Sequence, residues 1–94
     1  MISGTDTTLA VMRQTARVLQ SPTVSLADEV RALDQAEKAI AMAKAEKLAE
    51  MDATRAHESD GAASVTVWAR REICQDAGIT RAQVRSVSMT RTMH

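Results

Sequence analysis

The feature that most constrains this chain is a stretch from Leu26 to about Glu58 that contains no glycine and no proline. Alanine, glutamate, lysine and leucine dominate it, and their high helix propensity predicts one long helix over residues 26–58. About 32 residues at about 1.5 Å each would extend roughly 48 Å, whereas a compact chain of this length has a radius of gyration of only about 12 Å. We therefore expect that one chain is too small to cover such a rod.

Apolar residues in this stretch recur at helical spacing and form a narrow stripe, which Glu37, Lys44 and Arg55 interrupt. The helix could break near its alanine-rich middle, remain a solvated helix half-covered by its neighbours, or pair with a second copy. We expect a homodimer, because the stripe is too apolar to stay bare. The interface residues that this predicts are Leu26, Val30, Leu33, Ile40, Leu48 and Met51.

The remaining sequence also favours helices. Three glycines, one proline and one aromatic residue, Trp68, leave little turn material and predict a thin core, which argues against a sandwich or barrel. A first helix is expected over 6–20, where apolar residues fall on one face and Ser21-Pro22 ends the pattern. That face consists of Leu9, Met12, Ala16 and Leu19. The prediction is a single all-α domain over residues 1–94 with about four helices.

The C-terminal part resembles a helix-turn-helix. Ser64 is the expected N-cap of a helix over 64–77, and Thr80 with Gln83 predicts a capping box that opens a helix over 80–90. Between them, Ala77-Gly78-Ile79 is the expected turn. Inside this motif, Cys74 is expected to be a small buried residue, and Val84 and Val87 are expected to face inward. A plain helical hairpin with a glycine turn would give a similar pattern, so that alternative stays open.

Charge distribution bears on the partner. Twelve basic and twelve acidic residues cancel, which excludes a polybasic, histone-like surface. Residues 1–58 carry a net charge of −2 and residues 59–94 a net charge of +2, with arginine as the only basic residue type in the second part and no acid after Asp76. Arginine forks to phosphate or to guanine edges, so it suits a recognition helix. The expected nucleic-acid-binding residues are Arg81, Arg85, Gln83, Ser86 and Arg91.

Sequence support for catalysis is thin. His57 and Asp60 are too few ligands for a metal site, and no phosphate-binding or nucleophile motif occurs, so we expect no enzyme, no cofactor and no metal. His57 is expected near the C-terminal carbonyls of the long helix. Cys74 is the only cysteine, which favours a reducing compartment. No apolar run approaches the roughly 20 residues that span a bilayer, and the expected location is cytoplasmic.

The run from His57 to Ser64, followed by Trp68-Ala69 and Gly78-Ile79-Thr80, resembles the N-terminal helical domain of the actinobacterial repeat-family HNH endonucleases. The resemblance covers about 33–89. Its matching residues, Asp60, Gly61, Ala62, Ser64 and Trp68, would serve as turn, cap and core anchor rather than in catalysis. The spacing from Trp68 to Gly78 is longer than in the family, and the family's Ala-Arg pair is absent at Val84-Arg85.

Because the sequence ends at His94, short of where the HNH nuclease would begin, the resemblance implies an accessory domain of a phage or mobile element rather than a nuclease. We therefore predict a small DNA-binding, helix-turn-helix-like module that binds double-stranded DNA as a homodimer. The alternative is a protein-interaction module that docks through the long helix. Zero net charge favours the alternative, and the acid-free arginine end favours DNA.

Overall fold

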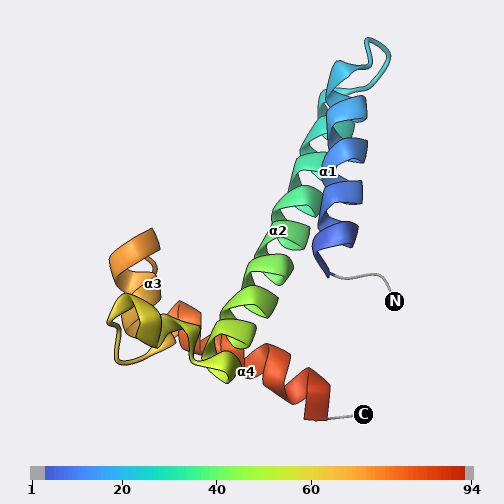
Figure 1. Cartoon of the computed structure of the whole chain (residues 1–94). Helices are drawn as coiled ribbons and strands as arrows, with labels where there is room; N and C mark the ends of the chain where they lie inside the picture. The colour runs from blue at the N-terminus through green and yellow to red at the C-terminus, as the bar shows by residue number, and fades with distance from the viewer. Residues whose placement is uncertain (1–3, 93–94) are drawn as a thin grey trace. The chain divides into compact units, whose positions relative to one another are not determined.

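The computed structural model describes residues 4–92, and side chains over 4–89. This part of the chain is all-α, as predicted, with a long central helix and no strand. Its elements are α1 (Gly4–Gln20), α2 (Leu26–Thr54), the 3-10 helix η1 (Ala56–Asp60), α3 (Val65–Ile73) and α4 (Ala77–Thr92), which Figure 1 shows in chain order. The chain divides into two compact units, 1–43 and 44–94, and α2 contributes to both.

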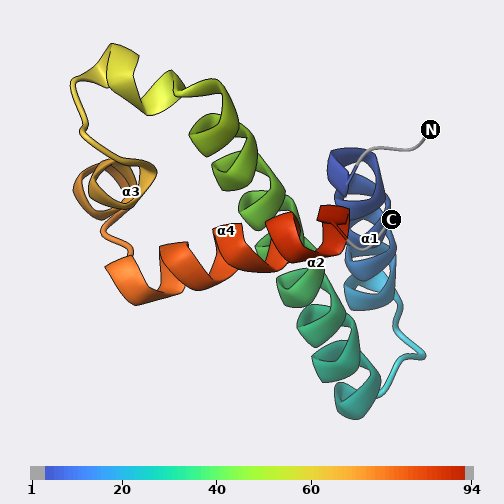
Figure 2. The ribbon, with the colours of Figure 1, turned by 90° about the horizontal axis from the view of Figure 1, so that it is seen from below.

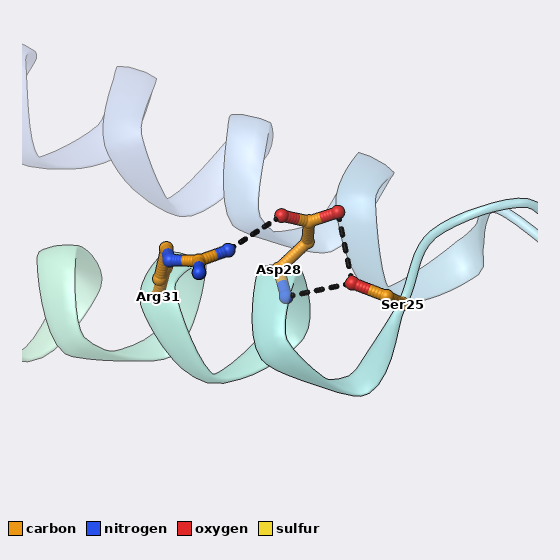
Figure 3. Close-up of polar contacts among 3 residues, drawn as sticks. All are labelled: Ser25, Asp28 and Arg31. Atoms are coloured by element: carbon orange, nitrogen blue, oxygen red, sulfur yellow. Dashed lines mark hydrogen bonds and ion pairs between the residues drawn. The ribbon is translucent and has the colours of Figure 1, made fainter.

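In the first unit, α1 and the beginning of α2 form an antiparallel hairpin, which both views show side by side (Figures 1 and 2). Pro22 lies in the turn between them, where it has no helical hydrogen bond to break. Ser25 caps α2: its Oγ accepts a hydrogen bond from the Asp28 amide at 3.2 Å and donates to Asp28 Oδ2 at 3.0 Å (Figure 3). Asp28 also accepts from Arg31 at 2.9 Å. This box fixes where α2 begins.

Small side chains line the seam between the two helices. Thr8 Oγ1 lies 2.8 Å from the carbonyl oxygen of Gly4 and 3.0 Å from that of Ala39 across the seam. Thr15 Oγ1 lies 3.3 Å from the carbonyl oxygen of Ala32 in the same way. Thr8, Thr15 and Ala36 are buried. The threonines therefore use their hydroxyls to hold the helices together. Leu9, Met12 and Leu19 of α1 are exposed, whereas Val11 and Val18 are partly buried.

The long helix is shorter than predicted. The expected span of 26–58 is wrong at its end, because α2 stops at Thr54 and Arg55 adopts a left-handed conformation with φ 60°. The 3-10 helix η1 follows, and Gly61 at φ 77° ends that element rather than the long helix. His57 consequently lies buried in η1, 5% exposed, and not beside the last carbonyls of α2.

The core of the second unit is small. Leu48 from α2 packs with Val65 and Ala69 from α3, and three partly buried residues surround them: Met51, Trp68 and Val84. The indole of Trp68 donates a hydrogen bond from Nε1 to Asp60 Oδ2 at 2.8 Å, so Trp68 joins η1 to α3. This core positions the start of α3 and the first turns of α4.

Candidate nucleic-acid interface

The helix α3 is the first helix of the predicted helix-turn-helix-like hairpin. Ser64 is its N-cap, as predicted, and its Oγ accepts from the Val67 amide at 3.2 Å. The predicted end at residue 77 is wrong, since α3 stops at Ile73 and Cys74 turns the chain with a left-handed φ of 54°. Cys74 is exposed, so its expected burial is also wrong. The turn is therefore Cys74-Gln75-Asp76, three residues before the glycine turn that the sequence favours.

Asp76 begins α4. The Gly78 amide donates to Asp76 Oδ2 at 2.9 Å, and the Thr80 amide donates to the Asp76 carbonyl at 3.1 Å. The predicted helix over 80–90 is thus wrong at its start, and Thr80 is not a cap but a fully buried residue inside the helix. Gly78 occupies the first turn of α4. An aspartate cap suits this end because it accepts from free amides and its charge complements the helix dipole.

A buried polar network holds the turn against α4. Gln75, only 9% exposed, donates from Nε2 to Thr80 Oγ1 at 2.7 Å and to Gln83 Oε1 at 2.9 Å. Both hydrogens of the Gln75 amide are thereby used. Gln83 is half-buried and its oxygen is occupied, so the structure gives this predicted base reader a structural partner instead. The network fixes the angle between the turn and α4.

Arg81 and Arg85 lie together on one exposed side of α4, where the sequence places them one turn apart. Both line a shallow depression of about 260 Å³, together with Asp52 of α2, Val65 and Thr66 of α3, and Val84 of α4. In the described part of the chain neither arginine forms an ion pair within 4.0 Å. In the described residues neither guanidinium group is therefore bound to a carboxylate, although Asp52 lines the same depression.

Asp52 and Thr66 are site residues that the sequence does not reveal. Asp52 comes from the last turn of α2 and Thr66 from the first turn of α3. They reach the depression because the core joins these helix ends, and no spacing in the sequence encodes that contact. Thr66 adds a hydroxyl beside the start of a helix, where free amides favour anions, whereas Asp52 opposes them.

The other predicted site residues are dispersed. Ser86 is exposed on α4, and the side chain of Arg91 lies outside the described residues. Of the predicted interface residues, Leu26, Val30, Leu33 and Ile40 are exposed, whereas Leu48 is only 4% exposed and belongs to the core of the second unit. Met51 is half-buried against that core. The predicted stripe is therefore split between an exposed part and a part that its own chain covers.

No family model matches the sequence, and the search finds no similar curated protein and no similar solved structure. In the described residues no helix is long and apolar enough to cross a membrane. Within that same range, no three histidine, cysteine, aspartate or glutamate side chains gather where they could hold a metal ion.

Proposed function

We propose that this chain is a non-catalytic DNA-binding module whose α4 contacts the phosphates of a duplex. The observation that carries the proposal is the pair of exposed arginines, Arg81 and Arg85, on α4, the second helix of the α3–α4 hairpin. A guanidinium binds a phosphate through two parallel hydrogen bonds, and two such groups one turn apart can hold neighbouring phosphates. The described part of α4 contains no acidic residue to oppose them.

Phosphate contact rather than base reading dominates this proposal. The exposed surface of α4 also carries Ile79 and Met89, which are 52% and 58% exposed, and Gln83 is held by Gln75. Of the predicted polar readers in the described part of α4, Ser86 is exposed and Gln83 is half-buried. Because bases are distinguished by hydrogen bonds in the groove and phosphates are not, we expect weak sequence preference.

A fluorescence anisotropy titration with a labelled duplex at about 50 mM salt tests the proposal. Arg81→Ala and Arg85→Ala should each weaken binding at least about fivefold, which corresponds to about 1 kcal/mol. The matched control is Arg17→Ala on α1. This variant removes an exposed arginine that is distant in the sequence from Arg81 and Arg85, and it should leave the affinity for the duplex unchanged. The melting temperature should stay constant in all three variants, because these side chains are exposed.

Two results would overturn the proposal. The first is no duplex binding by the unmodified protein at this salt concentration. The second is equal weakening by Arg17→Ala and Arg85→Ala, which would show that only the total charge matters. Association with HNH nucleases of phages or mobile elements is part of the proposal on the strength of the sequence resemblance alone, and pull-down with such a nuclease would test it.

A second candidate function is protein docking through α2. The observation that favours it is the exposure of Leu26, Val30, Leu33 and Ile40, which ranges from 79% to 45%. Large apolar side chains at helical spacing are typical of a helix that packs against another helix.

A further inference from the structure

The hairpin of the first unit has its large apolar residues on the outside. Its seam is built from threonines and alanines, whereas Leu9, Met12 and Leu19 of α1 are 43%, 44% and 42% exposed. Leu26, Val30, Leu33 and Ile40 of α2 are exposed as well. A two-helix hairpin with so little apolar burial is half of a bundle, because helices gain most of their stability by burying an apolar face.

The two exposed stripes lie on the same side of the hairpin. On α1, Leu9 follows the seam residue Thr8, and on α2, Leu33 and Ile40 follow Ala32 and Ala39. One residue advances about 100° around a right-handed helix. Each stripe is therefore turned by about 100° from the seam about the axis of its own helix. Because the two helices run in opposite directions, the turns have opposite sense when viewed from one end, and both stripes face the same side of the hairpin. Together they form an apolar face, made of Leu9, Met12, Ala16, Leu19, Leu26, Val30, Leu33 and Ile40.

The opposite side of the hairpin is polar, which supports this assignment. A shallow depression there is lined by Gln14, Asp28, Arg31 and Gln35, and also by Val18 and Val24. Gln14, Arg31 and Gln35 each precede a seam residue by one in the sequence, so they turn away from the apolar face. The hairpin therefore has one mostly polar side and one apolar side.

We propose that a second copy of this chain covers the apolar face, with α1 of one subunit lying antiparallel on α2 of the other in a four-helix bundle. Charge complementarity at the edges of the face points to this occupant. The seam pairs Thr8 with Ala39 and Thr15 with Ala32, so Arg13 and Asp34 lie at the same height on the two helices. Both are exposed on the side of their helix opposite to the seam, at the outer edges of the face.

A half-turn about an axis parallel to the helices stacks α1 on the partner's α2. It places Arg13 at the height of the partner's Asp34, and the symmetry repeats this ion pair on the other edge. Glu37, the charged residue within the stripe of α2, then lies within one helical turn of the partner's Arg13. In the single chain Asp34 pairs with Lys38 of its own helix at 2.9 Å, so the partner's Arg13 would join this carboxylate as a second cation.

The other symmetric stacking is disfavoured by the same charges. A half-turn about an axis across the helices would place α1 on the partner's α1. Arg13 would then approach the partner's Arg13, and Asp34 would approach the partner's Asp34, because both residues lie near the midpoint of the stripes measured along the helix axes. Like charges at an interface oppose association. The charged residues at the edges of the face therefore favour the arrangement in which α1 stacks on the partner's α2.

Sedimentation equilibrium of the full chain, without DNA, tests the inference. We expect a mass of twice 10.2 kDa at about 100 μM protein. Leu33→Lys should raise the dissociation constant at least about a hundredfold, because it buries a charge in the apolar face. The matched control is Met42→Lys, since Met42 is 67% exposed but lies on the polar side of the hairpin, and this variant should dimerise normally.

Charge reversal tests the arrangement without disturbing the apolar face. Arg13→Glu should weaken the dimer about tenfold or more at low salt, because two attractive pairs become repulsive. The double variant Arg13→Glu, Asp34→Arg should regain most of the affinity. Unchanged affinity in Arg13→Glu would overturn the stacking of α1 on the partner's α2.

A monomeric mass in the unmodified protein at the same concentration would overturn the whole inference, and hydrogen exchange would then show whether the chain's own second unit covers the face. Equal weakening by Leu33→Lys and Met42→Lys would also overturn it. Arg85→Ala should leave the mass unchanged, so failure of the dimer and failure of DNA binding are distinguishable.

Discussion

Removing the hydroxyl of Thr80 should destabilise the second unit without opening a cavity. Thr80 is 0% exposed, and its Oγ1 accepts the 2.7 Å hydrogen bond from Gln75 Nε2. Thr80→Val has nearly the same shape but leaves that N–H buried without an acceptor, which costs about 1–3 kcal/mol. For a unit of this size the melting temperature should fall by roughly 4–8 °C per kcal/mol.

A double-mutant cycle makes this prediction specific to the contact. Gln75→Met should also destabilise, since Thr80 and Gln83 lose their donor, but the combination with Thr80→Val replaces the pair by two apolar groups of similar size. The double variant should therefore be about 1–2 kcal/mol more stable than additivity predicts. Urea unfolding followed by the fluorescence of Trp68, the sole tryptophan, reports on this unit. A Thr80→Val cost below about 0.5 kcal/mol, or an additive cycle, would refute the buried network.

Three further predictions concern the same unit. Trp68→Ala should cost about 2–4 kcal/mol because it removes packing on the core and the bond to Asp60, and equal stability in urea would place the indole outside the core. Cys74→Gly should leave the free energy of unfolding unchanged or raise it by up to about 1 kcal/mol, because glycine adopts φ 54° without strain. In the unmodified protein the Cys74 thiol should react with a thiol reagent as fast as a cysteine in a free peptide, and slow reaction would contradict its exposure. Asp52→Asn should strengthen duplex binding about two- to fivefold by removing a negative charge beside Arg81 and Arg85, whereas weaker binding or a lower melting temperature would mean that Asp52 holds the arginines.

Local signals in the sequence identify several elements of this fold. Ser25 and Ser64 cap α2 and α3 as the sequence predicts. In each case the serine hydroxyl accepts a hydrogen bond from the backbone amide three residues later, and such a local interaction can be predicted from residue type and position alone. Likewise, the absence of glycine and proline after Leu26 is enough to predict a long helix. Arg55 shows the limit, since it ends α2 in a left-handed conformation that arginine rarely adopts.

The turn between α3 and α4 could not be located from residue preferences. Glycine is the usual residue at positive φ, so the sequence predicts the turn at Gly78. In the structure Cys74 adopts the positive φ, and Asp76 caps α4. Thr80 looks like a cap by type but is buried by its contact with Gln75. For Thr80, the hydrogen bond with Gln75 outweighs the local preference.

The candidate site shows the same division. Arg81 and Arg85 follow from helical spacing and from the absence of acid on α4. Asp52 and Thr66 join them only through the packing of α2 and α3, which no pattern in the sequence reports. In the hairpin, the sequence places the apolar residues of α1 on one face but does not reveal that Thr8 and Thr15 occupy the seam, where small side chains let the two helices approach closely.

The salt dependence of duplex binding tests the proposed function most directly. Each phosphate neutralised contributes a slope of about −0.9 to the plot of log affinity against log salt, so Arg81 and Arg85 on both subunits of a dimer predict a slope of about −4. Arg85→Ala should reduce the magnitude of that slope by about 2, one contact per subunit, with no change in melting temperature. A slope near zero, or a slope that Arg85→Ala leaves unchanged, would contradict phosphate binding by α4.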